Sequence, residues 1–280
     1  MAQPVWITGA GGLIGGYVAR SAPPGTPVRA LTREHLNLTD AAAVSAAFRA
    51  DRPAAVIHCA ALSKSVACQE NPPLARRLNV DVTAVLAGLA AAVPFLLLST
   101  DMVFDGRTGN YDETAAVHPL SAYAETKVAA EEIVLANPRH FVVRTSLNGG
   151  VSPTGDRGFN EEMANAWRAG RTLSLFTDEF RCPLPAAVTA RALWELLAAG
   201  APGLYHLAGS RRLSRWEIGR IVAARRPELN ARREPGSLRD YQGAPRSPDT
   251  SLNCAKIQRC LSFPLPGLEE WLTAHPTEPF

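Results

Sequence analysis

The sequence lacks the features of a membrane protein or a secreted disulfide scaffold. Its 280 residues contain no apolar run that approaches the length of a membrane span, and no charged-then-apolar leader precedes the first predicted strand. The five cysteines are an odd number without a C-x-x-C pair, so we expect free thiols in a reducing compartment. These absences predict a cytoplasmic protein without a membrane partner.

Charge and histidine spacing exclude two further classes. The net charge of +3 is small and dispersed, which does not favour a nucleic-acid partner. His35, His118 and His140 lack the spacing of metal ligands, so we expect no catalytic metal. The chain is 46% hydrophobic and 20% charged, which is ordinary for one large domain or two closely joined ones.

The most informative stretch is at the start of the chain. A short apolar strand at 5–8 runs into a glycine turn and then into a helix predicted over 13–21. Gly9, Gly12 and Gly15 have the spacing G-x-x-G-x-x-G, a shifted relative of the dinucleotide-binding fingerprint. Glycine allows the tight turn and a close approach to a pyrophosphate, while the helix N-terminus, with Leu13 and Ile14, supplies N–H groups. The alternative is a strand-to-helix turn without a ligand.

Strands and helices then alternate. Apolar segments at 28–31, 54–59, 95–98 and 141–143 predict strands, and helices are predicted at 41–50, with Asp40 as its cap, and at about 74–92. This rhythm predicts an α/β fold with a parallel doubly wound sheet of the Rossmann type. Ligands of such sheets bind beyond the carboxyl ends of the strands, where this chain has Cys59, Ala60, Ala61, Ser99, Thr100, Asp101 and Arg144.

The end of the second strand bears on the choice of cofactor. An acidic residue there would hydrogen-bond the ribose 2′-hydroxyl of NAD, but the sequence has Thr32 and Arg33. Arginine can pair with the 2′-phosphate of NADP, so we expect NADPH, with NADH as the alternative. An exposed loop arginine without a ligand is the other interpretation of Arg33.

Tyr123 and Lys127 form the second informative pair. They are four residues apart, so on a helix they share one face. A phenol has a pKa of about 10, and a nearby ammonium would lower the pKa of Tyr123 and make it a usable acid. Thr100 would hold a substrate oxygen beside the phenol. A pair on a surface helix is the alternative, since the Y-x-x-x-K spacing is common.

With these residues, the sequence resembles the extended short-chain dehydrogenases/reductases, and more narrowly the dTDP-4-dehydrorhamnose reductase group. The matching stretches follow the family order over nearly the whole chain: 56–61, 79–80 with 84, 99–106, 111–113, 119–120, 143–146, 203–209 and 245–248.

The resemblance implies reduction of a 4-keto sugar attached to a nucleotide, with Tyr123 protonating the new alkoxide. Lys127 would also hold the nicotinamide ribose, and Asn79 would brace the site. Further cofactor-binding positions implied are Asn37, Leu38, Cys59, Ala60, Ala61, Ser99 and Arg144. Asp101 is followed by Met102 rather than the glutamate of related dehydratases, which argues against dehydration.

Several positions depart from the family pattern. Met102 replaces the usual tyrosine, Leu147 a tryptophan and Asn37 an aspartate, and the segment 177–183 differs throughout. The sugar pocket, which includes Thr100 and Asp101, has therefore changed, and the substrate need not be dTDP-4-dehydrorhamnose. Arg181 and Arg246 are candidates either for diphosphate contacts or for structural salt bridges.

Two other functions stay open. The family includes a non-catalytic regulatory subunit of methionine adenosyltransferase, and an epimerase–reductase would need a second acid–base residue such as Cys182. We expect an NAD(P)-binding domain at 1–146 plus about 184–208, and a smaller substrate domain at about 147–183 and 209–280. A homodimer is a family expectation.

Overall fold

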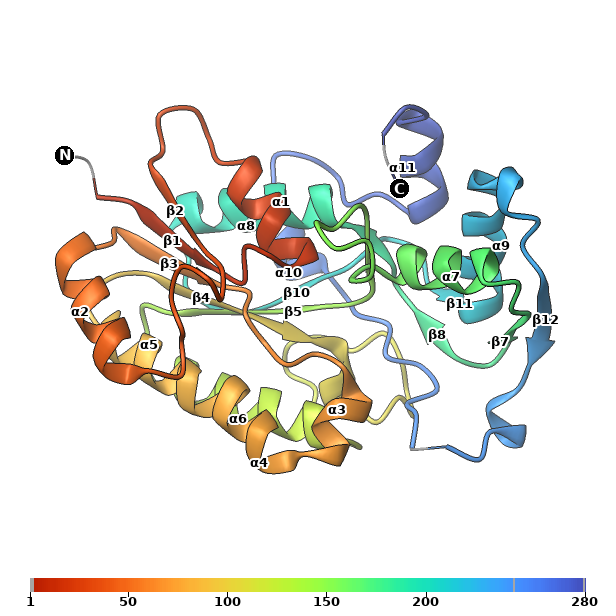
Figure 1. The fold of residues 1–280 in the computed structure, drawn as a ribbon, viewed down its shortest axis with the longest axis horizontal. Helices are drawn as coiled ribbons and strands as arrows, with labels where there is room; N and C mark the ends of the chain where they lie inside the picture. The colour runs from red at the N-terminus through yellow and green to blue at the C-terminus, as the bar shows by residue number, and fades with distance from the viewer. Residues whose placement is uncertain (1–2, 244, 279) are drawn as a thin grey trace.

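Six parallel strands form the central sheet in the computed structural model, which describes residues 3–243, 245–278 and 280 (Figure 1). This confirms the predicted doubly wound α/β fold. Across the sheet the strands are β2 (Val28–Leu31), β1 (Val5–Thr8), β3 (Ala55–His58), β4 (Phe95–Thr100), β5 (Phe141–Thr145) and β10 (Gly203–Leu207).

The strands form because their side chains are apolar on both sides, as a sheet covered on two faces requires. Neighbouring residues in each strand enter opposite core clusters. Ile7, Ile57, Leu96 and Val143 belong to one cluster, and Trp6, Val56, Leu97 and Val142 to the other.

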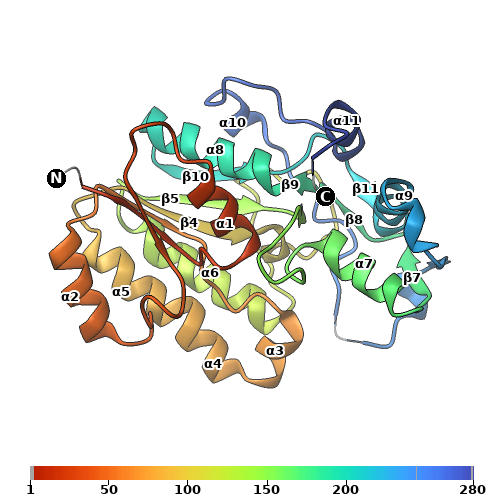
Figure 2. The same cartoon turned by 45° about the horizontal axis from the view of Figure 1, so that its top comes forward.

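Helices cover both faces of the sheet (Figures 1 and 2). On one side α1 (Leu13–Arg20) packs against α8 (Ala186–Ala199), and the Trp194 indole donates a hydrogen bond to the Val18 carbonyl at 2.9 Å. On the other side lie α2 (Ala41–Asp51), α5 (Val82–Leu89) and α6 (Ala122–Leu135). No helix of the described residues is long and apolar enough to cross a membrane.

The helix predicted at 74–92 is present as one continuous helical segment over 72–89, but it contains a π-helical turn and ends earlier than predicted. The segment is divided into α4 (Pro72–Arg76), the π-helix η1 (Arg77–Asp81) and α5, and α3 (Ser65–Glu70) precedes it. Asn71 separates α3 from α4 because its side chain caps α4, accepting a hydrogen bond from Leu74 N at 3.0 Å. A π-helical turn carries one extra residue and is frequent at functional sites. Here it contains Asn79.

A smaller lobe lies beyond the carboxyl ends of the sheet (Figure 2). It contains α7 (Phe159–Arg168), β7 (Leu173–Phe176), β8 (Phe180–Arg181), β11 (Leu213–Ser214), α9 (Arg215–Arg225), η3 (Pro227–Leu229), β12 (Arg233–Gly236), η4 (Leu238–Asp240) and α11 (Leu268–Ala274). The strands β6 (Asn148–Gly149) and β9 (Leu184–Pro185) pair with each other, and α10 (Ala255–Gln258) packs on β10. The predicted division into two domains stays a prediction.

The cap of α2 gives a stability test of the sequence-based assignment. The Asp40 carboxylate accepts a hydrogen bond from Ala43 N at 2.9 Å. We expect Asp40→Ala to lower the free energy of unfolding by about 1 kcal/mol, measured by urea denaturation. Asp81→Ala is the control, because Asp81 is exposed and its side chain caps no helix. Equal losses in both variants would contradict the capping role.

Candidate active site

The glycine turn after β1 brings the chain against the end of β3. Gly9 has a φ of +70°, and a Cβ atom there would lie 2.7 Å from Ala60 N. Gly12 N donates to Gly9 O at 2.8 Å and closes the turn. Because β1 lies between β2 and β3, the turn opens at the topological switch point of the sheet, where ligands of such folds bind.

The first turn of α1 suits an anionic group. Its N-cap is Gly12, and no side chain caps this end of the helix. The amides of Leu13, Ile14 and Gly15 therefore have no side-chain partner, and the helix dipole favours a diphosphate beside them. The Leu13 side chain is buried in the protein, so only its backbone can serve a ligand. These residues fit the diphosphate of a dinucleotide.

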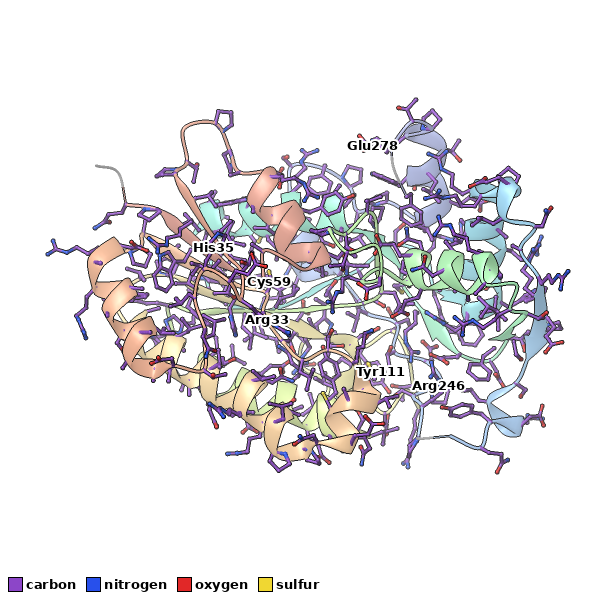
Figure 3. All side chains as sticks on the ribbon, viewed as in Figure 1. Arg33, His35, Cys59, Tyr111, Arg246 and Glu278 are labelled. Atoms are coloured by element: carbon purple, nitrogen blue, oxygen red, sulfur yellow. The ribbon has the colours of Figure 1, made fainter. Side chains whose placement is uncertain are left out.

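The loop after β2 fits the adenosine end of the same ligand. Arg33 is exposed and forms no ion pair within the described residues. Figure 3 shows Arg33, His35 and Cys59 on the part of the molecule built around the central sheet. The Asn37 side-chain oxygen accepts hydrogen bonds from Thr39 N and Oγ1 at 3.1 and 2.9 Å, so it holds this turn, and only its amide nitrogen remains for a ligand. Leu38 packs against the core.

The end of β3 has no group that titrates near neutral pH. Burial raises the pKa of the Cys59 thiol to about 12. His58, one residue earlier, lies between Thr8 and Thr83, and burial lowers its pKa to about 3. Half-buried Ala60 and Ala61 follow. The end of β3 is therefore uncharged at neutral pH, which suits the predicted close approach of a cofactor.

The Asn79 side chain is bound within the protein in the bracing role that the resemblance implied, and its assignment as a cofactor contact stays a prediction. Its side-chain oxygen accepts from Leu62 N at 2.7 Å, and its nitrogen donates to Leu62 O at 3.1 Å and to Thr126 Oγ1 at 3.0 Å. The π-helix turns this buried amide inward, where it links the loop after β3 to α6.

Tyr123, Lys127 and Thr100 come together where β4 ends beside α6. Ser121 caps α6, which fixes where the helix begins. The Lys127 ammonium is buried and donates to Leu98 O at 2.8 Å. Tyr123 packs with Cys68, Ala75 and the half-buried Met102, Leu62 and Ala122, and Thr100 lies close enough to lower the pKa of its hydroxyl. The three predicted catalytic residues therefore lie together at the end of β4.

The ionisation of Tyr123 differs from the expectation. Burial is the largest cause and raises the pKa of the phenol, while the Thr100 hydrogen bond lowers it only in part. The predicted lowering by Lys127 is therefore wrong for the protein alone, since the ammonium bonds to Leu98 O. Burial also lowers the pKa of Lys127, to about 8, although Glu131 acts in the opposite direction. The Tyr123 phenol is therefore protonated at pH 7.

The side chains of Ser99 and Arg144 both contact Glu131, and the assignment of these two residues to cofactor binding stays a prediction. The Ser99 hydroxyl donates to the Glu131 carboxylate. Arg144 Nε lies 3.1 Å from each oxygen of the same carboxylate, and its Nη2 lies 2.6 Å from Oε2. Sequence reasoning missed Glu131. Its spacing of four residues after Lys127 was the available signal.

Asp101 and Arg181 are predicted substrate contacts, but both are buried in the protein. The Asp101 carboxylate accepts from Ser146 at 2.7 Å and from Thr250 at 2.9 Å. Arg181 lies 3.9 Å from Asp101 and pairs with Glu179 at 3.0 Å. Of the two interpretations considered for Arg181, the structural salt bridge is correct. Asp101 fastens the end of β4 to the smaller lobe.

Arg246 differs from Arg181 because its side chain is 36% exposed while it pairs with the buried Glu179 at 2.8 Å. It borders a cavity of about 610 Å³ beside the residues that precede α6. The lining residues are Asp105, Arg107, Val117, His118, Pro119, Leu120, Arg246 and Pro248. Arg246 lies toward the smaller lobe in Figure 3, away from Arg33 and Cys59. Leu147 is half-buried against the main core.

A tyrosine and a lysine one helical turn apart, beside the switch-point crevice of such a sheet, are typical of short-chain dehydrogenases/reductases. The fold and the site define this class. Within it, the chain belongs to the family described as RmlD substrate binding domain, whose model matches residues 3–277. The predicted resemblance is confirmed.

The relatives that are similar in sequence include proteins named as reductases and a protein named as a subunit of an adenosyltransferase. The dTDP-4-dehydrorhamnose reductase of Mycolicibacterium smegmatis is 32% identical, over 98% of this chain and 84% of that protein. Methionine adenosyltransferase 2 subunit beta of Xenopus laevis is 28% identical, over 90% of this chain and 81% of that protein. The crystal structure of dTDP-4-dehydrorhamnose reductase from Bacillus anthracis in complex with NADP has a TM-score of 0.88 and 23% identity, covering 98% of each chain.

The glycine turn can be tested by cofactor binding. We expect Gly9→Ala to weaken NADPH binding by about tenfold or more, because a Cβ at positive φ is strained by roughly 1–2 kcal/mol and meets Ala60 N. Titration of NADPH fluorescence measures the affinity. Gly88→Ala in α5 is the control, because no other group lies within 4 Å of the position that its methyl would occupy. Unchanged affinity in a folded Gly9→Ala protein would contradict the role of the turn.

Proposed function

We propose that this protein is an NADPH-dependent reductase of a keto group on a nucleotide-activated deoxysugar. The observation that carries the proposal is the meeting of Thr100, Tyr123 and Lys127 at the end of β4, beside the switch point. Membership of the family and the reductase relatives support the same conclusion. A cytoplasmic location and a homodimer belong to this proposal as expectations.

The proposed chemistry assigns the proton to this chain. NADPH, when bound, supplies the hydride. Tyr123 donates its phenolic proton to the carbonyl oxygen as that oxygen gains negative charge, and Thr100 holds the oxygen in place. The Lys127 ammonium stabilises the phenolate that remains on Tyr123 and holds the nicotinamide ribose. The apolar surroundings of Tyr123 keep water from competing for the proton.

Exposed arginines are placed for the phosphate groups of the cofactor and of the substrate. Arg33, after β2, is placed for the 2′-phosphate of NADPH, with NADH as the weaker alternative. The cavity bordered by Arg107 and Arg246 presents two guanidinium groups beside the start of α6, where a diphosphate of the substrate would bind. Each group also pairs with a carboxylate, Arg107 with Asp105 and Arg246 with Glu179. Met102 and Leu147 give the sugar pocket apolar side chains, so we infer a deoxysugar without committing to dTDP-4-dehydrorhamnose.

Two alternatives are weaker. A regulatory role, as for the subunit of methionine adenosyltransferase that is similar in sequence, has no need for a buried Tyr–Lys pair. An epimerase–reductase would need a second acid–base group, and burial raises the pKa of Cys182 to about 11. The thiol is thus fully protonated at neutral pH and a poor base.

Removing the phenolic proton tests the reductase directly. With NADPH and enzymatically generated dTDP-4-dehydro-L-rhamnose, we expect Tyr123→Phe to lower kcat by about 10² or more while NADPH binding is retained. Consumption of NADPH is followed by absorbance at saturating substrate. Other keto sugars are tested if the wild type does not react. Binding of NADPH without turnover of any keto sugar would favour the regulatory subunit.

Arg33 tests the cofactor preference. Arg33→Ala removes the charge facing the 2′-phosphate, so we expect NADPH affinity to fall by about tenfold while NADH affinity is unchanged. Calorimetric titration of both cofactors measures the ratio. Arg49→Ala, an exposed arginine in the last turn of α2, serves as the control. A parallel loss for both cofactors would show that Arg33 does not read the 2′-phosphate.

A further inference from the structure

Three consecutive residues of β4 meet three residues spaced by four along α6. Thr100 lies beside the Tyr123 phenol, whose pKa it lowers, the Leu98 carbonyl accepts from Lys127, and Ser99 donates to Glu131. Residues at i, i+4 and i+8 share one helical face, so α6 presents this face to the end of one strand. The first two contacts involve the proposed acid and its lysine. The third has no role in the proton transfer described above.

Glu131 is a buried carboxylate with a complete set of partners. It is 3% exposed, and it accepts hydrogen bonds from Ser99 and from both Nε and Nη2 of Arg144. Arg144 is the residue paired with Ser99 in the register of β4 and β5, which places its side chain against the same carboxylate. Its guanidinium also lies over the Phe104 ring, 5.1 Å from the centroid. The position of the Glu131 carboxylate is thus fixed by these contacts.

The charged and titratable groups around Lys127 are few. On α6 they are Tyr123 and Glu131, and at the end of β3 they are His58 and Cys59. Asp101, whose pKa is raised by burial, follows β4 directly, and on β5 Arg144 lies behind Glu131. Burial holds His58 neutral by lowering its pKa and holds Cys59 neutral by raising its pKa. Glu131 is therefore the carboxylate of this set that raises the pKa of the buried ammonium.

We propose that Glu131 is a positioning residue that keeps Lys127 charged beside Tyr123, and that Arg144 holds the carboxylate in place for this task. This inference rests on the proposed reductase function. Without the carboxylate, burial alone would govern the ammonium, whose pKa would fall below its present value of about 8. The active form carries the proton on Lys127, so activity is lost as the pH rises through that pKa. Removing Glu131 moves this loss to lower pH.

The experiment compares pH profiles of kcat. For the wild type we expect an alkaline fall near pH 8, and for Glu131→Gln a fall displaced by about one pH unit toward acid. Glu132→Gln is the matched control, an exposed glutamate on the same helix. Glu131→Asp keeps the charge, so its alkaline fall should stay close to that of the wild type even if kcat or thermal stability declines.

A further variant separates charge from packing. Glu131→Gln leaves Arg144 buried and unpaired, which costs stability and adds a positive charge near Lys127. The double variant Glu131→Gln with Arg144→Gln removes both charges, so we expect its alkaline fall to lie between those of the wild type and the single variant. If the single variant does not fold, the Asp and double variants still decide between charge and packing. Alkaline falls that coincide in all folded variants would overturn the proposal.

A second readout does not depend on turnover. The ¹⁵N resonance of the Lys127 ammonium, followed in ¹⁵N-lysine-labelled protein with NADPH bound, reports its ionisation directly. We expect its titration to move toward acid in Glu131→Gln and to stay unchanged in Glu132→Gln. A wild type that titrates this way but reduces no keto sugar would refute the reductase while leaving the Glu131–Lys127 coupling intact. An unshifted Lys127 titration in Glu131→Gln would refute the coupling itself.

Discussion

The burial of one positive charge constrains the whole site. Lys127 is only 2% exposed and lies beside β4, and an unpaired ammonium is unfavourable in such a buried position. Its hydrogen bond to Leu98 O fixes α6 against β4, and the same helix face then places Tyr123 beside Thr100. A helix that shifted by one residue would lose the lysine contact and the tyrosine position together. Stability and geometry are therefore linked through this contact.

Charge burial also explains how the two lobes are joined. Asp101 directly follows β4. Its carboxylate accepts hydrogen bonds from Ser146 and Thr250, which lie on segments far apart in the sequence. In the smaller lobe, the Glu179 carboxylate forms ion pairs with both Arg181 and Arg246. Buried carboxylates require several donors, and here the donors come from separate segments. Asp101 and Arg181, which were expected to contact substrate, thus fix the walls of the site.

The sequence was sufficient for the features that depend on local pattern. Alternating apolar segments predicted the sheet, the glycine spacing predicted the turn, and the four-residue spacing predicted that Tyr123 and Lys127 share a face. It was not sufficient where a side chain has competing partners. Ser99, Arg144 and Asn79 have residue types that suit a ligand, and only the fold shows that Glu131, Leu62 and Thr126 occupy their polar atoms. The π-helix was missed for a similar reason, since no local pattern marks it.

Two of the departures from the family pattern, Met102 and Leu147, lie where this buried network imposes least. Met102 and Leu147 are half-buried and apolar, and no side-chain hydrogen bond ties them to the network described above. Exchanging such residues changes the shape and polarity of a pocket without leaving a buried charge unpaired. This freedom is absent at Glu131, Arg144, Asp101 and Lys127. Replacing any one of them would leave its polar partner buried without a hydrogen bond. A site built this way can change its sugar while its proton donor stays in place.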